Sequence, residues 1–259
     1  MLVLSVSTHL HIRITLRHSE PEIIRELEVP ADYSVYELHL ALQVSLGWND
    51  LEAFEFVRTK LTVGVESAYA GAGLVHDGHT YRHADEVLAG ELLPRVGQQA
   101  TYTYDFSRLW EFRLQLLGRV ERDHGLPVCT RVEEAAPIED ADNLEAFYGM
   151  LIAAADPRQQ LHELALQFLG DDFNVSGPTP AEVSEALALL FGEEVEPHGV
   201  EDDQSDADWG WWDPSKYDDR MRLRVKQQEI TDSLPEDLDT LNPQDKHAAL
   251  LKVLRGTQS

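Results

Sequence analysis

The sequence has little positive charge. Lysine and arginine number 21 against 47 aspartate and glutamate residues in a chain of 259, and the formal net charge is −26. Proteins that wrap nucleic acid neutralise its phosphates with clustered lysine and arginine side chains. We therefore expect no direct nucleic-acid binding, and we expect that any charged partner is basic.

Cysteine and long apolar runs are also scarce. The one cysteine, Cys129, excludes an intramolecular disulfide and a cysteine-based zinc cage, and it is typical of a reducing compartment. No apolar run approaches the roughly 18 residues that cross a bilayer, and the N-terminus lacks the basic start of a signal peptide. These absences predict a cytoplasmic protein without membrane contact.

Common enzyme signatures are missing as well. We find no P-loop, no GxGxxG, no GxSxG and no HExxH pattern in the sequence, so the frequent nucleotide-dependent, hydrolase and zinc-protease classes have no support. No cofactor is expected. With 43% hydrophobic residues, the chain nevertheless has the composition of a globular protein.

The negative charge is unevenly distributed, and this divides the chain. Residues 1–120 carry a net charge of −6, whereas residues 193–219 alone carry 11 acidic residues against one lysine, with prolines and glycines among them. Such a composition is typical of a linker or loop. We predict an α+β domain over 1–192, whose sheet spans 1–120 and whose helical region spans 121–192. An acidic tryptophan-rich linker or loop over 193–219 and a basic-faced strand with a C-terminal helix over 220–259 are expected to follow.

Hydrophobic periodicity predicts strands in the first 120 residues. Apolar residues alternate from Leu10 to Leu16, which indicates a half-buried strand. Ser34 and Glu37 form a capping-box pattern at the start of a helix that Gly47 ends. One or two short strands over 54–65, a polar loop over 70–83 and a short helix near 84–91 are expected next.

Two aromatic strands follow, close enough for an antiparallel hairpin. Tyr102, Tyr104 and Phe106 are expected on one face of the first, and Trp110 and Phe112 on one face of the second.

From about residue 142 the period changes to that of a helix. An apolar stripe runs from Leu144 to Ala155, Asp156 is expected to cap a second helix, and Thr179 a third that ends at Gly192. The predicted fold class is α+β: an antiparallel-rich mixed sheet in the N-terminal half with helices packed on it, followed by a helical C-terminal half.

Several short segments in this order resemble the plasmid pRiA ORF-three-like family, also known as TnpR-type insertion-element passenger proteins. The similarity covers roughly residues 10–192. It implies an α+β fold and an association with bacterial mobile elements, but no established reaction. The segments are PEIIRELEVPAD (21–32), YELHLALQVSLGW (36–48), YTYDF (102–106) with Trp110 and Glu111, LPVC (126–129), APIED (136–140), ADPRQ (155–159) and LGDDFN (169–174).

The sequence also departs from the family pattern. Ser107 and Arg108 stand where the family has Gly-Asp, Phe112 replaces a histidine, and the segment around APIED has lost its cysteines and glycines. If the family binds an ion or small ligand through those groups, this chain does not do so in the same way. The sequence also lacks the serine-centred arginine cluster and basic arm of a serine recombinase.

The aromatic hairpin contains the first candidate site. Asp105 and Glu111 flank its turn and could serve as general acid and base if their environments separate their pKa values. The same carboxylates could instead cap the turn and pair Arg108. Together with Tyr104 and Trp110, these residues are our candidate ligand or partner surface.

Histidines suggest a second candidate. His76, His79 and His83 are possible ligands of a transition metal, although the spacing matches no specific motif and also fits a solvated loop.

Two further groups have both a chemical and a structural explanation. The acidic cluster Glu139, Asp140 and Asp142 could hold a divalent cation or favour the start of the following helix. Cys129 could be a nucleophile with His124 beside it or a small buried apolar residue.

The segment 206–219 carries Trp209, Trp211 and Trp212 among carboxylates. Exposed tryptophans anchor interfaces, and the surrounding acid would steer a basic partner; alternatively, the tryptophans fold back on the main body. The leading hypothesis is a non-catalytic accessory or interaction protein of mobile-element origin. The alternatives are a metal-dependent or acid/base enzyme using Asp105 and Glu111, and an acidic DNA mimic that binds a basic protein.

Overall fold

The structure is a computed structural model of the full chain. It describes residues 6–64, 75–76, 79–170 and 173–192, without the side chains of residues 75, 76 and 79. These residues all belong to the first of two compact units, residues 1–212. The predicted acidic linker over 193–219 and the predicted strand and helix over 220–259 lie outside the described residues.

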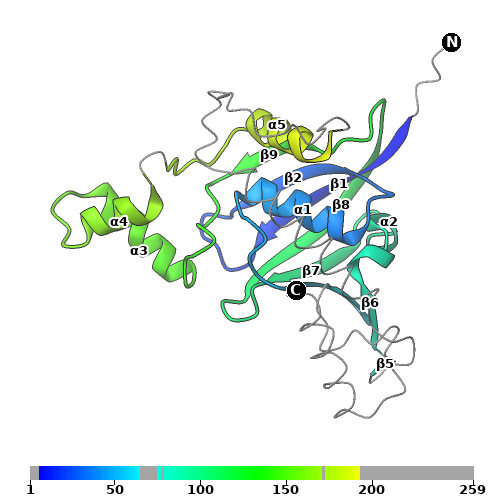
Figure 1. The fold of residues 1–259 in the computed structure, drawn as a ribbon, viewed down its shortest axis with the longest axis horizontal. Coiled ribbons are helices and arrows are strands. Elements are labelled where there is room, and N and C mark those ends of the chain that lie inside the picture. The colour runs from blue at the N-terminus through cyan, green and yellow to red at the C-terminus, as the bar shows by residue number, and fades with distance from the viewer. Residues whose placement is uncertain (1–5, 65–74, 77–78, 171–172, 193–259) are drawn as a thin grey trace, which may run out of the picture. The chain divides into compact units, whose positions relative to one another are not determined.

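A nine-stranded sheet forms the body of the described region, in the order β5-β6-β4-β3-β7-β8-β1-β2-β9 (Figure 1). Neighbouring strands are antiparallel except β4 and β6, which are parallel. The antiparallel-rich mixed sheet that the sequence predicts is therefore confirmed. Its strands are β1 (Ser7–Leu16), β2 (Ile24–Pro30), β3 (Phe54–Arg58), β4 (Leu61–Gly64), β5 (Val75–His76), β6 (His79–His83), β7 (Gln99–Tyr104), β8 (Trp110–Arg122) and β9 (Val128–Glu133).

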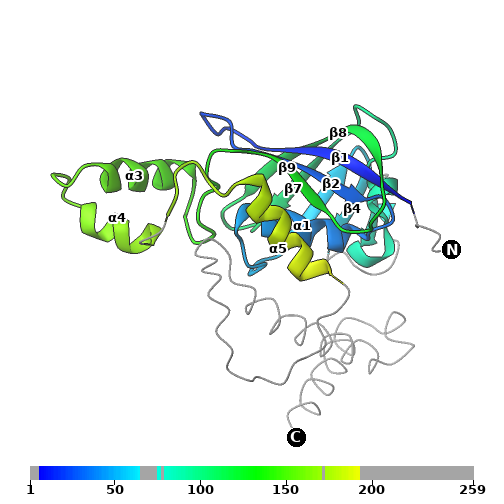
Figure 2. The same ribbon diagram turned by 90° about the horizontal axis from the view of Figure 1, so that it is seen from above.

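Helices cover one face of this sheet; α1, η1 and α2 lie between its strands in sequence, and α3, α4 and α5 follow the last strand. Figure 2 shows α1 and α5 on the same side of the strands, and α3 and α4 pack on each other beside the sheet. None of the described helices combines the length and apolar character needed to cross a bilayer. The helices are α1 (Val35–Leu46), the 3₁₀ turn η1 (Ala84–Glu86), α2 (Ala89–Leu92), α3 (Leu144–Ala155), α4 (His162–Leu169) and α5 (Pro180–Phe191).

Local sequence signals explain two of the helix boundaries. The Ser34 hydroxyl accepts from the Glu37 amide, and the Glu37 carboxylate accepts from the Ser34 amide. Thr179 and Glu182 form the same reciprocal pair at the start of α5. At the end of α1, Gly47 adopts φ 74°, a left-handed conformation that glycine accommodates without strain. Both capping boxes are confirmed.

Strand β1 has the alternation that the sequence predicts, with Leu10, Ile12 and Ile14 buried beneath α1. Strand β2 has no alternation because all seven of its residues are buried. Its three charged residues, Arg25, Glu26 and Glu28, interrupt the apolar pattern, and all three find partners inside the protein.

The structure corrects several local expectations. Strand β9 lies within the region predicted to be helical and forms the sheet edge beside β2. Residues 79–83, expected in a loop, form strand β6 because β4 supplies a hydrogen-bonding partner. Phe106 does not continue the buried face of Tyr102 and Tyr104, since β7 ends at Tyr104 and the chain turns at Asp105 with φ 54°.

The second helix of the C-terminal half also begins later than predicted. Asp156 ends α3 instead of capping α4, and its carboxylate accepts from the backbone amide and the guanidinium of Arg158. This local turn delays α4 until His162. An aspartate followed by proline starts a turn as readily as a helix.

The α5 capping box yields a stability prediction. We expect Thr179→Ala to lower the free energy of unfolding by ~1 kcal/mol, because the Glu182 amide loses its acceptor. Thr179→Ser keeps the hydroxyl and should stay within a few tenths of a kcal/mol of the parent. Urea denaturation of the three proteins measures the difference, and equal stability of the alanine and serine variants would refute the role of the cap.

Candidate functional site

Asp105, the central candidate of the aromatic hairpin, organises the turn between β7 and β8. One carboxylate oxygen accepts from the Ser107 amide at 2.9 Å and the Arg108 amide at 3.2 Å. The other accepts from the Arg108 guanidinium at 2.8 Å. Asp105 is 1% exposed, so its carboxylate is buried and is occupied by the hydrogen bonds of the turn.

The pKa of Asp105 reflects these contacts. Burial by itself would raise the pKa of the carboxyl group, but the hydrogen bonds from Ser107 and Arg108 outweigh it and hold the pKa below its ordinary value. Asp105 is thus a carboxylate at neutral pH. A general acid needs the opposite shift.

The remaining hairpin candidates do not form one surface. Tyr104 and Trp110 are buried, and only Arg108 and Glu111 are partly exposed. Glu111 pairs with Arg17 of the loop after β1 at 3.5 Å, whereas Asp105 pairs with Arg108. The two carboxylates proposed as acid and base are held by different arginines.

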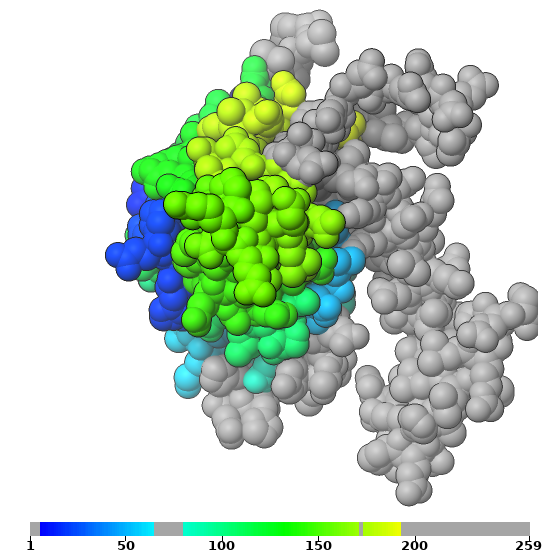
Figure 3. Space-filling model, turned by 90° about the vertical axis from the view of Figure 1, so that its left-hand side faces the viewer, coloured from blue at the N-terminus to red at the C-terminus, as the bar shows by residue number. Residues whose placement is uncertain are grey.

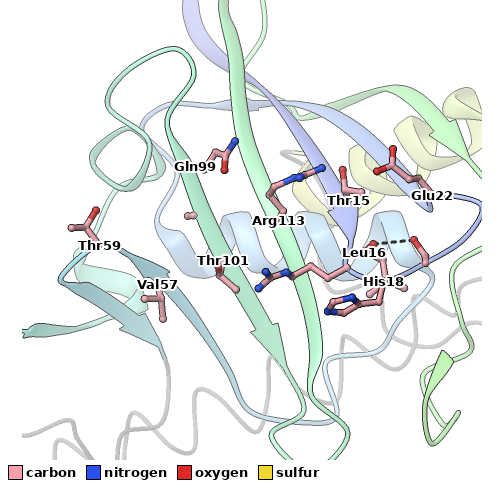
Figure 4. Close-up of a pocket in the computed structure, with 12 residues that line it drawn as sticks. Thr15, Leu16, His18, Glu22, Val57, Thr59, Gln99, Thr101 and Arg113 are labelled. Carbon is pink, nitrogen blue, oxygen red and sulfur yellow. Dashed lines mark hydrogen bonds between the residues drawn. The ribbon is translucent and has the colours of Figure 1, made fainter. Parts of the chain in front are cut away.

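A hollow of about 440 Å³ lies on the open face of the sheet, beside Arg17. Figure 4 shows Thr15, Thr101 and Arg113 projecting from β1, β7 and β8 into it. Arg113 forms no ion pair with any described residue. The lining of the hollow is polar and combines Arg17 and Arg113 with the acidic Glu22.

A buried polar cluster that the sequence did not predict lies on the other face, beneath α1. His39 is 0% exposed. Its Nδ1 lies 2.8 Å from the Tyr102 hydroxyl and its Nε2 lies 2.9 Å from an Asp50 carboxylate oxygen. The Gln43 amide donates to the Tyr102 hydroxyl at 2.8 Å, and its oxygen accepts from the Asp50 amide at 2.9 Å. These groups form a closed ring of hydrogen bonds.

Every hydrogen bond of the ring has one donor and one acceptor when the His39 imidazole is neutral and carries its proton on Nε2. Asp50 then accepts from His39, the Tyr102 hydroxyl donates to Nδ1, and Gln43 donates to the hydroxyl oxygen. The His39 ring also stacks on Phe54 with 3.5 Å between ring centroids. Because i and i+4 positions share a helix face, His39 and Gln43 both reach the Tyr102 hydroxyl.

A second network adjoins the first and is centred on Glu139, which is buried. Its carboxylate accepts from the Asn49 amide at 2.7 Å, from the Leu51 amide at 3.0 Å and from the Tyr104 hydroxyl in a short hydrogen bond. The Tyr104 hydroxyl accepts in turn from the Glu52 amide at 3.0 Å. Burial and the nearby Glu139 charge raise the pKa of Tyr104, so the phenol remains a donor.

Trp48 adds a contact between the segments 36–48 and 136–140, since its indole N–H donates to the Pro137 carbonyl at 2.7 Å. The three segments YELHLALQVSLGW, YTYDF and APIED therefore converge on one buried structure. The signal that could have revealed it is a histidine and a glutamine four residues apart on a mostly apolar helix. Their partner Asp50, and Glu139 in the adjoining network, had no comparable signal.

An Asp–His–Tyr series resembles a proton relay, and accessibility decides against that role. A reacting group must lie within hydrogen-bonding reach of a substrate. Tyr102 and His39 are both fully buried, and the hydroxyl already lies between His39 and Gln43. The arrangement fixes the loop after α1 to the sheet.

Of the acidic candidates near Glu139, Asp142 directly precedes the N-cap of α3, so the explanation that it favours the helix start stays a prediction. Helix α3 begins at Leu144, and Asn143 caps it by accepting from the Ala146 amide. Glu139 points into the protein and not toward this helix end, so neither the cation site nor the helix-start explanation applies to it.

The histidine candidates are only partly described. His83 caps η1 and lies 3.3 Å from the Asp85 carboxylate, while the side chains of His76 and His79 lie outside the description. Within the described residues, no group of three histidine, cysteine or acidic side chains is placed to hold a metal. The histidine metal site stays a prediction, as do the roles of Trp209, Trp211 and Trp212, which also lie outside the described residues.

Cys129 is buried in β9. Burial raises the pKa of its thiol to about 11. A neutral, enclosed thiol is a poor nucleophile, and this favours the structural explanation.

Comparison with known proteins places these features in a family context. Residues 8–179 match the family described as Plasmid pRiA4b ORF-3-like protein. The chain is similar to the uncharacterized protein y4hQ of Sinorhizobium fredii, at 23% identity over 189 residues that cover 70% of this chain and 92% of that protein. A crystal structure of a protein of unknown function, MM3350 from Methanosarcina mazei Go1, has the same fold, with TM-score 0.58, 24% identity and coverage of 69% and 97% of the two chains.

The closed ring around Tyr102 predicts a large effect of a small change. Tyr102→Phe leaves His39 and Gln43 without their shared partner, and we expect it to lower the free energy of unfolding by ~1–3 kcal/mol. The control is Tyr148→Phe, whose hydroxyl accepts only from the exposed Glu20 amide. Urea denaturation compares the two, and an equally small loss in both would contradict the ring as a structural clamp.

The lowered pKa of Asp105 predicts an acid-dependent loss of stability. A carboxyl group whose pKa is lower in the folded than in the unfolded chain stabilises the fold above its unfolded value of ~3.9, and this is lost as pH falls through the folded pKa. Asp105→Asn tolerates the left-handed backbone but removes this charge. We expect the variant to be less stable at pH 7 and to lose less stability between pH ~5 and ~2. Chemical denaturation across that range is the measurement, and parallel pH profiles would disprove the assignment.

Proposed function

The chain belongs to the plasmid pRiA4b ORF-3-like protein family, and we propose that it is a non-catalytic, cytoplasmic interaction protein of bacterial mobile-element origin. The observation that carries the proposal is that the polar side chains at the centre of three family-like segments, His39, Tyr102 and Glu139, are buried and hydrogen-bonded within the protein. These buried groups build a scaffold and do not meet a substrate. Function is then carried by surfaces.

The helix pair α3–α4 supplies the surface that supports this proposal best. Leu161, Leu164 and Phe168 follow at i, i+3 and i+7, so they lie on one face of α4, and they are 59%, 58% and 45% exposed. Ile152 of α3 is 64% exposed. Figure 3 looks onto the side of the molecule where this pair lies. We call these four residues the α3–α4 apolar surface.

This surface is not turned toward the protein's own core. On α4 only Ala165 is buried, and on α3 only Phe147. The sequence predicts that both apolar stripes pack inward, but Leu161, Leu164 and Phe168 remain exposed. Grouped exposed apolar side chains on a helix pair are typical of protein–protein interfaces.

Charge favours a partner other than a second copy. A net charge of −26 repels an identical chain and attracts a basic protein at long range. In this proposal the α3–α4 apolar surface supplies contact area, and the acidic residues of 193–219 with Trp209, Trp211 and Trp212 select a basic partner. The same charge is the reason that we expect no direct binding of nucleic acid.

The test uses paired variants of the full chain. We expect Leu164→Gln with Phe168→Gln to keep the fold but to lose partners that cross-link to the tagged parent protein in its native host. The matched control, Val6→Gln with Val96→Gln, also removes two exposed apolar side chains and should retain those partners. Mass spectrometry of the cross-linked species is the readout.

Two outcomes would overturn the proposal. Identical partners from both variants would remove the role of the α3–α4 apolar surface. If sedimentation analysis shows that the parent protein is a dimer and that the Leu164→Gln, Phe168→Gln variant is a monomer, then the partner is a second copy of the chain. A chain lacking residues 197–219 tests the acidic segment separately. For this variant we expect that added salt no longer weakens the capture of partners.

A further inference from the structure

Arg113 is an exposed cation in the hollow on the open face of the sheet. Its side chain forms no ion pair and no hydrogen bond with any described residue. Its neighbours differ, because four arginines of β1, β8, β9 and the loop after β1 each pair with a carboxylate: Arg13, Arg17, Arg122 and Arg131. In a chain with 47 acidic and 21 basic residues, a cation among paired arginines that has no described carboxylate beside it needs an explanation.

Arg113 also lies in the middle of a row of polar residues that crosses three strands. Thr15 of β1 is directly opposite it on one side, and Thr101 of β7 is directly opposite it on the other. Directly opposed residues of antiparallel strands have Cβ atoms about 4.5–5.5 Å apart, so the two threonines flank the arginine. All three side chains project into the hollow (Figure 4).

The hydroxyls of this row are available to a ligand. Neither Thr15 nor Thr101 makes a side-chain hydrogen bond to a described residue, although Thr15 is only 5% exposed. The Thr15 hydroxyl is not among the partnerless side-chain atoms that the described structure closes to solvent, so its small exposed area faces the hollow. A nearly buried hydroxyl without a protein partner gains free energy from a ligand that bonds to it.

The remaining wall of the hollow is polar on both sides of the row. Figure 4 shows Gln99 on one side and Glu22 on the other. Glu22 is exposed, and its carboxylate can only accept hydrogen bonds when it is ionised. The volume of about 440 Å³ lies within the range of roughly 300–1,000 Å³ that is typical of small-molecule sites. The hollow therefore combines a cationic centre with hydrogen-bonding groups at its rim.

We propose that this hollow binds the phosphate monoester of a polyol, such as a sugar phosphate, with the phosphate over Arg113. A guanidinium bonds phosphate through two parallel N–H groups, and Thr15 and Thr101 each add one hydroxyl donor. The polyol hydroxyls would donate to Glu22 and bond to Gln99. The proposal concerns the face of the sheet opposite α1 and is independent of the proposed protein-interaction function.

The arrangement of donors favours a phosphate over a carboxylate. The donors come from three neighbouring strands, about 4.8 Å apart, so the oxygens of the anion must point in several directions. A phosphate monoester has three terminal acceptor oxygens, whereas a carboxylate has two in one plane. Arg17 adds a second positive charge to the lining, although Glu111 lies 3.5 Å from its guanidinium.

Titration calorimetry of the full-length protein tests the proposal with glucose 6-phosphate and glycerol 3-phosphate, beside glucose and inorganic phosphate. An ionic strength of about 0.15 M screens the repulsion between the acidic chain and the anionic probes. We expect saturable binding of at least one ester and no binding of glucose. Inorganic phosphate should bind at least about 10-fold more weakly than that ester, because it lacks the polyol contacts.

Two variants remove the groups that would hold the phosphate. Arg113→Gln should weaken binding of the ester by at least about 10-fold, or ~1.4 kcal/mol. Thr15→Val removes the hydroxyl but keeps a β-branched side chain, and it should weaken binding by at least about 3-fold.

The matched control is Arg95→Gln. Arg95 is also exposed and without a described carboxylate partner, but it does not line the hollow, so this variant should bind as the parent does. Circular dichroism reports whether Thr15→Val folds, and Arg113→Gln provides the test if it does not. The proposal is overturned if neither ester binds, if glucose or inorganic phosphate binds equally well, or if Arg113→Gln binds as Arg95→Gln does. Ester binding that appears only in a chain lacking residues 197–219 would also overturn it, because the acidic segment would then be the occupant.

Discussion

The described structure depends on the burial of one carboxylate. Glu139 lies beneath the sheet, and its charge is stabilised by donors from the loop after α1 and from Tyr104. Because a buried carboxylate needs such donors, the loop cannot move away from the segment 137–139 without exposing or orphaning the charge. The same contact fixes the loop that carries Asp50 and so completes the ring around His39.

Both buried charges, Glu139 and Arg25, are satisfied mainly by backbone groups. Glu139 accepts from loop amides, and Arg25 donates to four carbonyls. The difference is that the Glu139 carboxylate also has a side-chain donor in Tyr104, whereas Arg25 keeps one nitrogen that no described residue uses.

How much the sequence could predict depends on how far apart along the chain the residues lie that produce each pattern. Capping boxes and strand alternation depend on residues only two or three positions apart, and the predictions at Ser34, Thr179 and β1 are confirmed. The cluster of His39, Asp50 and Glu139 depends on contacts between distant segments, which periodicity does not encode. Strand β2 was equally hidden, because burial on both faces removes the alternation that marks a strand. The family resemblance supplied part of the information on distant contacts that periodicity lacks. It identified segments that meet in space, but it did not indicate which side chains join them.

Helix α4 is the element on which the proposed interaction surface depends. It packs on α3, but only its Ala165 is buried, and its middle presents Leu164 and Phe168 to solvent. Because packing on α3 holds the helix while leaving these apolar side chains in water, a partner that covers them gains the free energy of burying apolar surface without first having to order the helix.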